Sequence, residues 1–198
     1  MKKVLSILLM LGGGGLIGYL IGGLLKGDGG GESAIPKEHG IWMFLSLLVW
    51  YFIVVGVHEL GHVFAGRWQN FDFHGLTIGP FSWKPDAAGK IRFKWNTSLN
   101  LAGGLAIMLP NGDERLRQRF MWFGAGGPIA SVLLALLLYG FYLLAPDRSL
   151  GAGLLFVGAL LSAAIFVATI LPFRAGGFSS DGLRILTFAR NGPPPWRI

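Results

Sequence analysis

The sequence predicts an α-helical polytopic membrane protein that forms a single membrane-embedded domain over residues 1–198. Three observations favour this fold class. Charged residues make up only 14% of the chain and apolar residues 53%, whereas soluble domains contain roughly 25% charged residues. Four apolar segments are each long enough to cross a bilayer as a helix. Basic residues gather in alternate connections between these segments, which is typical of multi-pass membrane proteins.

The four predicted spans cover about residues 4–25, 41–65, 121–144 and 150–172. The first span follows two lysines, so a secretory signal peptide is the alternative interpretation. No A-x-A-like cleavage site follows it, and the apolar run is long for a signal peptide, so we favour a retained helix. Its glycines repeat every four residues and predict a face for close helix packing, formed by Gly14, Gly18 and Gly22.

Lysine and arginine residues predict the orientation of the chain in the membrane, because they collect on the cytoplasmic side. They are frequent between residues 67 and 119 and in the C-terminal tail, and few in the other connections, which contain Lys26, Lys37 and Arg148. We therefore expect a cell-membrane protein with both termini and the 67–120 loop in the cytoplasm. The net charge of +7 then indicates contact with anionic lipid rather than with nucleic acid.

The 67–120 loop is predicted to contain a small membrane-associated β-hairpin or sheet. Basic and apolar side chains alternate over residues 90–95, a shorter alternation covers 71–74, and residues 85–89 have the composition of a turn. We expect the apolar face to lie against the membrane or the helices, through Ile91, Phe93 and Trp95. An exposed edge could bind an unwound substrate as an added strand; a hairpin that only spaces the helices is the alternative.

The third span is predicted to extend a helix that starts earlier in the same loop. Asn111-Gly112-Asp113 is interpreted as the cap of a helix that continues through Arg115 and Arg119 into the membrane. Small residues at 124–127, followed by Pro128, favour close packing against the second span. In the alternative interpretation, Ser131 or backbone carbonyls near Pro128 line a water path or contact substrate.

A His-Glu-Leu-Gly-His motif at the end of the second span predicts a metal site. His58 and His62 are four residues apart, so on a helix they project from one face and can bind one Zn²⁺, with Glu59 beside them as general base. Chance occurrence or a pair of hydrogen-bonded core histidines are the alternatives. Ionisable residues inside a spanning helix are costly and usually functional, which favours the metal interpretation.

The third metal ligand must be a histidine, aspartate or glutamate, because the chain has no cysteine. A metzincin would need Gly at position 65 and His at position 68, where this chain has Ala65 and Trp68. Of the candidates on the predicted cytoplasmic side, only Asp181 directly follows a span; the others are Asp72, His74, Asp86 and Asp113. The alternative interpretation of Asp181 is a cap for a short C-terminal helix over 182–190.

In these motifs and their order, the chain resembles the site-2 protease family of intramembrane zinc metalloproteases. The resemblance covers about residues 41–186. It rests on the histidine motif at 58–62, on Gly127-Pro-Ile-Ala-Ser131, and on Leu171-Pro172 followed by Asp181-Gly182. It implies that Asp181 is the third ligand of one Zn²⁺. It also implies that Gly127 and Ser131 form the family's Gly-x-x-x-Asn/Ser element, which supports the substrate or the structure.

The chain departs from the family's usual pattern at two places. Thr169 stands where the family commonly has an asparagine before Leu-x-Pro, so it keeps a hydrogen-bonding group but lacks the amide. Residues 173–180 form a longer spacer before Asp181 than the family shows. We expect this spacer to re-enter the membrane and return Asp181 to the zinc.

The resemblance implies hydrolysis of peptide bonds within or next to transmembrane segments, with Glu59 activating water at the zinc. The expected partners are the lipid bilayer and a transmembrane or membrane-associated peptide substrate. Two other functions stay open: a zinc-binding membrane scaffold without protease activity, and a membrane-anchored zincin that cuts soluble peptides at the cytoplasmic face. The carboxylate between the two histidines favours an enzyme, because a purely structural site does not need it. The sequence indicates neither the substrate's identity nor the oligomeric state.

Overall fold

A computed structural model describes residues 40–97, 103–146, 149–175 and 178–191. Over these ranges the chain forms four α-helices, a four-stranded antiparallel sheet and a two-stranded hairpin. The predicted span at 4–25, with Gly14, Gly18 and Gly22, lies outside the described residues. So does the C-terminal end beyond residue 191.

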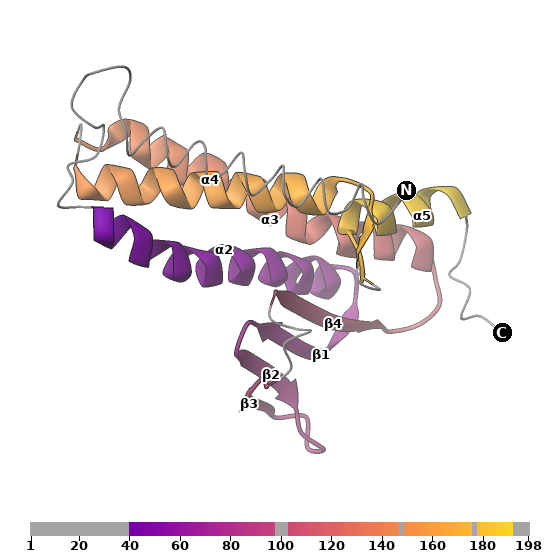
Figure 1. The fold of residues 1–198 in the computed structure, drawn as a ribbon. Helices are drawn as coiled ribbons and strands as arrows, with labels where there is room; N and C mark the ends of the chain where they lie inside the picture. Colours follow the sequence, from indigo (N-terminus) through magenta and orange to yellow (C-terminus); the bar gives the residue numbers. More distant parts are fainter. Residues whose placement is uncertain (1–39, 98–102, 147–148, 176–177, 192–198) are drawn as a thin grey trace.

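Three helices are long and apolar enough to cross a membrane: α2 (Gly40–Trp68), α3 (Leu116–Leu144) and α4 (Leu150–Ile170). They correspond to the predicted spans at 41–65, 121–144 and 150–172. Figure 1 shows them side by side, with α3 packed along both α2 and α4. Large apolar side chains remain exposed on their outer faces, among them Leu48, Leu133, Leu137 and Leu144. Such surfaces are suited to lipid contact.

The closest approach between α2 and α3 occurs where two glycines face each other. A Cβ atom on Gly61 would collide with the backbone oxygen of Gly126, and a Cβ atom on Gly126 would collide with that of Gly61. This backbone contact agrees with the packing interpretation of residues 124–128. Because Gly61 lies between the two histidines of the motif, it also brings their side chains against α3.

The start of α3 differs from the sequence prediction. The helix begins at Leu116, and the residue before it, Arg115, has φ 47° and makes no side-chain cap hydrogen bond. The N-cap position is therefore Arg115 and not a residue of the predicted Asn111-Gly112-Asp113 cap. Instead, Arg119 ties the loop to the end of α2 by donating hydrogen bonds to the backbone oxygens of Gln69, Asn70, Asn111, Gly112 and Glu114. The five donors of one guanidinium group thus hold the loop before α3 against the end of α2.

The predicted antiparallel sheet is present and is larger than the sequence indicated. Its strands are β1 (Phe71–Ile78), β2 (Phe81–Pro85), β3 (Ile91–Trp95) and β4 (Gly104–Pro110), in the order β3-β2-β1-β4. Strand β4 runs antiparallel to β1, from the pair Phe71 and Pro110 to the pair Ile78 and Gly104. Neither β2 nor β4 was predicted. Within the described part of the chain, β4 therefore forms one edge of the sheet and β3 the other.

The sheet packs against the C-terminal half of α2, where Val55 forms a buried cluster with Leu76 and Ile78. Strand β3 is the edge strand farthest from α2 (Figure 1). Its apolar residues Ile91, Phe93 and Trp95 are 60%, 48% and 67% exposed. The rings of Phe93 and Trp95 contact those of β2. No described helix covers these three side chains, so the expected contact with the helices is wrong. Their contact with the membrane stays a prediction.

The segment after α4 turns back sharply instead of continuing the span. Residues 174–175 (β5) pair with residues 178–179 (β6), and α5 (Asp181–Asn191) follows directly. A Cβ atom on Gly182 would collide with the backbone oxygen of Ile170, so the start of α5 lies against the end of α4. The ring of Phe188 stacks on Phe120 of α3. Together these contacts hold the first residue of α5 beside the helices.

Candidate metal centre

Helix α2 supplies two histidines that face the same point between the helices. The His58 and His62 side chains are buried, at 5% and 6% exposure. Both Nε2 atoms point toward α5, and they lie 3.3 Å apart. The four-residue spacing produces this arrangement, because residues i and i+4 of a helix lie one above the other.

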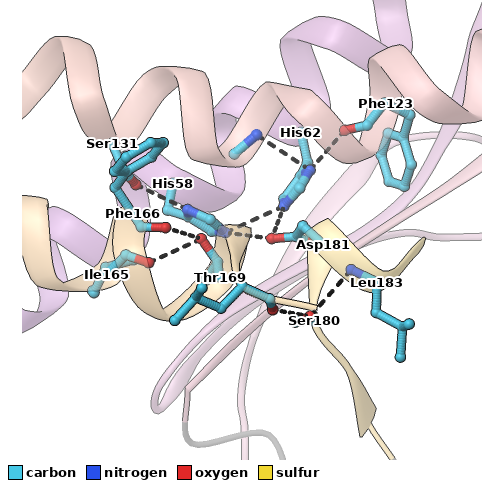
Figure 2. A network of polar contacts seen from close by, with 12 residues as sticks. His58, His62, Phe123, Ser131, Ile165, Phe166, Thr169, Ser180, Asp181 and Leu183 are labelled. Carbon is cyan, nitrogen blue, oxygen red and sulfur yellow. Dashed lines mark hydrogen bonds and ion pairs between the residues drawn. The ribbon is translucent and has the colours of Figure 1, made fainter. Parts of the chain in front are cut away.

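Helix α5 supplies a carboxylate to the same point. The Oδ2 atom of Asp181 lies 3.1 Å from Nε2 of His58 and 3.3 Å from Nε2 of His62 (Figure 2). Ser180 caps the helix, because its Oγ accepts the backbone N–H of Leu183. The Asp181 side chain therefore does not act as the helix cap, which was the alternative interpretation, and it faces the two histidines.

The three ligand atoms form a triangle of the size that zinc requires. Atoms bound to one tetrahedral Zn²⁺ at about 2.0–2.1 Å are about 3.3–3.4 Å apart, and the observed separations are 3.1, 3.3 and 3.3 Å. Helix α3 leaves space for the ion because Gly127 has no side chain. A Cβ atom on Gly127 would collide with Nε2 of His62 and lie 2.6 Å from Nε2 of His58. The two-nitrogen, one-oxygen donor set also suits zinc. These residues therefore fit a zinc site.

Hydrogen bonds behind the histidines fix the direction of both rings. Nδ1 of His62 lies 2.7 Å from the backbone oxygen of Phe123, which can only accept, so Nδ1 carries the proton. The Gly127 N–H, 3.3 Å from the same nitrogen, cannot then donate to it. Nδ1 of His58 lies 2.9 Å from Oγ of Ser131. The Nε2 lone pair of His62 is thus directed to the metal position, and the Ser131 hydroxyl can accept the Nδ1 proton of His58 and so allow the same for His58, as such outer partners usually ensure.

The carboxyl group of Asp181 is in the ionised state that a metal ligand needs. Burial alone would raise the pKa of this group. The adjacent His58 and His62 side chains have the opposite effect and hold the pKa of Asp181 below its usual range. The aspartate therefore carries its negative charge at neutral pH.

Glu59 lies next to the triangle without belonging to it. It is 8% exposed and faces the edge of the sheet at β4, where a Cβ atom on Gly104 would lie 2.5 Å from its Oε1. The backbone N–H of Ala106 approaches the same carboxylate. Strand β4 therefore holds the glutamate in place, and only a residue without a side chain fits at position 104.

A cavity of about 440 Å³ opens onto Glu59 and the three ligands. Its walls come from α2, β4, the end of α4 and the start of α5, and they include Val55, Leu105, Ala106, Ile165, Ala168 and Phe173. Most of these side chains are apolar. The space is therefore suited to an apolar peptide segment that passes the metal position.

The residues assigned to substrate or structural support have separate places. Gly127 lines the metal cradle, and Ser131 is fully buried behind His58, away from the cavity lining. Ser131 therefore contacts His58 and does not line the cavity. Thr169 lines the cavity, but its hydroxyl donates to the backbone oxygen of Ile165 at 2.9 Å, with Phe166 at 3.3 Å (Figure 2). Its hydrogen is thus used within α4.

The other candidates for the third ligand lie elsewhere. Asp72 and Asp113 are exposed, and so is His74, at the β-bulge of β1. Asp86 holds the β2–β3 turn through the N–H groups of Ala88 and Lys90 and pairs with Arg92 at 2.9 Å. Among the described residues, one group of histidines and acids could share a metal, and it consists of His58, His62 and Asp181.

Sequence reasoning missed two residues that the structure places at the site, Gly104 and Arg184. Nothing in the sequence pointed to Gly104, because its role depends on how β4 pairs with β1. Arg184 did have a signal: it follows Asp181 by three residues, so on a helix the two share a face.

Comparison with known proteins gives one match. The family model described as Peptidase family M50 matches residues 46–169, more than half of the chain. No curated protein and no solved structure matches the sequence. The matched region contains the histidine motif, the sheet and the α3 cradle, and it ends before Asp181.

Proposed function

Because the chain belongs to Peptidase family M50, the site-2 protease family, we propose that it is a zinc endopeptidase. Its proposed substrates are peptide bonds within or next to transmembrane segments of membrane proteins or peptides. The observation that carries the proposal is the triangle of His58, His62 and Asp181 beside Glu59, on a helix long enough to span a membrane. The cavity beside it has room for an extended apolar segment.

In this proposal the protein holds the ion and moves one proton. His58, His62 and Asp181 hold Zn²⁺, which, when bound, supplies Lewis-acid activation of water and of the substrate carbonyl at neutral pH. Glu59 accepts a proton from the attacking water as the water oxygen bonds to the carbonyl carbon. It then donates that proton to the amide nitrogen as the C–N bond breaks. The products are a carboxylic acid and an amine, and the second proton of the water then passes from the acid to the amine to leave a carboxylate and an ammonium group, while Glu59 returns to its starting state.

The sheet edge is proposed to present the substrate in extended form. A helical segment hides its carbonyl groups in hydrogen bonds and must unwind before attack. Strand β4 forms an edge of the described sheet and lies beside Glu59, so an unwound segment can add to it as a further strand. Segments with glycine, proline or polar residues are therefore the expected substrates.

The test is metal content and cleavage of a panel of transmembrane segments by the purified chain. Glu59→Gln should retain zinc and lose activity, because it removes the proton acceptor without removing a ligand. Asp181→Ala should lose zinc and activity together. Zinc retention with cleavage in Asp181→Ala would overturn the ligand assignment. Normal zinc binding with no cleavage by the wild type would favour a zinc-binding scaffold.

A further inference from the structure

Several side chains that line the cavity carry hydrogen-bond donors, among them Thr169, Ser180 and Arg184. In peptide hydrolysis the carbonyl oxygen takes on negative charge, and a donor aimed at it speeds the reaction. The hydroxyl of Thr169 donates to Ile165 within its own helix. The hydroxyl of Ser180 donates to the backbone oxygen of Leu171 at 2.6 Å. Neither side chain is therefore available to the substrate oxygen.

Arg184 is the one lysine or arginine among the described residues that line this cavity. It is half-buried, and no carboxylate within the described ranges lies at ion-pair distance from its side chain. A guanidinium group stays charged at any pH at which a protein folds. A partly buried cation without an ion-pair partner is costly unless a ligand supplies the negative charge.

The position of Arg184 on α5 places it at the cavity, on the side of the helix that carries Asp181. It follows Asp181 by three residues, so both lie on the same side of the helix. The adjoining side of α5 is occupied by packing against α3, through Phe188 on Phe120 and Ile185 beside Gly124. The Ser180 cap and the contact of Gly182 with Ile170 fix the start of the helix. Arg184 is therefore held beside the ligand that Asp181 provides.

We propose that Arg184 is a catalytic residue that donates hydrogen bonds to the carbonyl oxygen of the scissile bond as charge develops there. The inference rests on the proposed protease function. As the water oxygen bonds to the carbonyl carbon, the π electron pair of the C=O bond moves to the oxygen, and the Arg184 guanidinium stabilises that charge without losing a proton. The pair returns when the C–N bond breaks. The apolar walls strengthen this interaction, because charges attract more strongly where water is excluded.

The first test compares Arg184→Gln with a matched control, Arg190→Gln, at the exposed far end of the same helix. Arg184→Gln should retain zinc and lower kcat by about 10²–10³-fold, the usual effect of removing one such donor, with little change in KM. Arg190→Gln should leave both constants unchanged. Arg184→Lys keeps the charge and should recover part of kcat, and it replaces Arg184→Gln if that variant does not fold. A rise in KM alone would overturn the proposal, because it would mean that Arg184 binds an anionic group of the substrate.

The second test measures inhibitor binding and does not need turnover. N-phosphoryl-Leu-Phe carries a tetrahedral anion like the developing oxyanion, whereas leucine hydroxamate binds zinc without one. Arg184→Gln should lower the affinity for the phosphoryl peptide by at least tenfold and leave the affinity for the hydroxamate unchanged. Equal binding of the phosphoryl peptide to wild type and variant would overturn the role of Arg184. A wild type that binds zinc but cleaves nothing would instead contradict the protease function.

Discussion

At the scale of single residues, the site depends on side chains that are absent as much as on those that are present. Gly127 leaves the space that an ion needs beside His58 and His62, and Gly104 leaves the space that Glu59 occupies. Gly61 and Gly126 bring the two helices into backbone contact. Gly127 and Gly104 face functional side chains, and Gly61 and Gly126 face each other's backbone, so the smallest possible addition, one methyl group, is expected to disturb the site.

Gly127→Ala is predicted to abolish zinc binding while the protein stays folded. The new methyl group would stand between the two Nε2 atoms, at the position proposed for the metal. Zinc content of the purified variant, measured by atomic emission, checks the prediction. Gly140→Ala is the matched control on the same helix, because nothing lies within 4 Å of a Cβ atom there. Normal zinc content in Gly127→Ala would show that the metal position has been misassigned.

Ser131→Ala is predicted to lower zinc affinity about 10- to 100-fold, the usual cost of losing a hydrogen-bond partner behind a ligand. The change removes the acceptor for Nδ1 of His58 in a fully buried place. Competition with a fluorescent zinc chelator measures the affinity. Ser149→Ala removes the cap of α4 and so controls for a general loss of stability. Equal affinity in the two variants would contradict an orienting role for Ser131.

At the scale of elements, the end of α2, strand β4 and the start of α5 must meet for the site to exist. Strand β4 touches Glu59, while α5 supplies Asp181, the proposed third ligand. The two-residue strands β5 and β6 explain why a spacer longer than the family's usual one still returns Asp181 to the histidines: it turns back on itself. Strand β4 also offers one of its edges to a peptide, which makes a prediction about substrates.

Substrate backbone N–H groups are predicted to matter at alternate positions. In strand addition, every second residue of a peptide directs its N–H toward the edge of the sheet. N-methylation at the residues whose N–H groups face the sheet should therefore raise KM by about two- to twelvefold per lost bond, since a backbone hydrogen bond contributes about 0.5–1.5 kcal/mol. N-methylation at the intervening residues, whose N–H groups point away from the sheet, should change KM little. A scan of singly methylated peptides against the purified enzyme measures this, and a flat profile would contradict addition to β4.

At the scale of the whole molecule, the sheet, α5 and the metal centre gather at one end of the three long helices (Figure 1). The basic residues of the 67–120 loop lie on the elements at this end. From the positive-inside rule we expect this end to face the cytoplasm and the connection between α3 and α4 to face the other side. The proposed orientation therefore places the active site near the cytoplasmic surface.

Single cysteines are predicted to react from opposite sides of the membrane. The chain has no cysteine, so each introduced thiol is the only one. Ala88→Cys, in the exposed β2–β3 turn, should react with an impermeant maleimide only after cells are permeabilised. Pro146→Cys, exposed between α3 and α4, should react in intact cells. Labelling of both in intact cells, or the reverse pattern, would contradict the orientation.

Features encoded by neighbouring residues could be predicted from the sequence. The helices at 40–68, 116–144 and 150–170 follow from continuous apolar runs, and the pair His58 and His62 follows from helical spacing. Strands β2 and β4 were missed, because a short apolar run does not distinguish a strand from a helix segment, and β4 pairs with a distant partner, β1. The cap at 111–113 was wrong for a related reason. The loop is held by Arg119, a residue of the helix itself, through bonds that no local pattern reveals.

The sequence by itself determined the family, the apolar helices and the residue types of the site, because spacing and composition express these locally. Only the tertiary structure decided that Asp181, 123 positions from His58, comes within hydrogen-bonding distance of it. Only the tertiary structure brought Ser131 into contact with His58 and Gly104 into contact with Glu59, and only the tertiary structure placed Arg184 at the cavity. These contacts arise from how α5 and β4 pack against α2 and α3. Such packing is a property of many side chains acting together, and no short segment of the chain contains it.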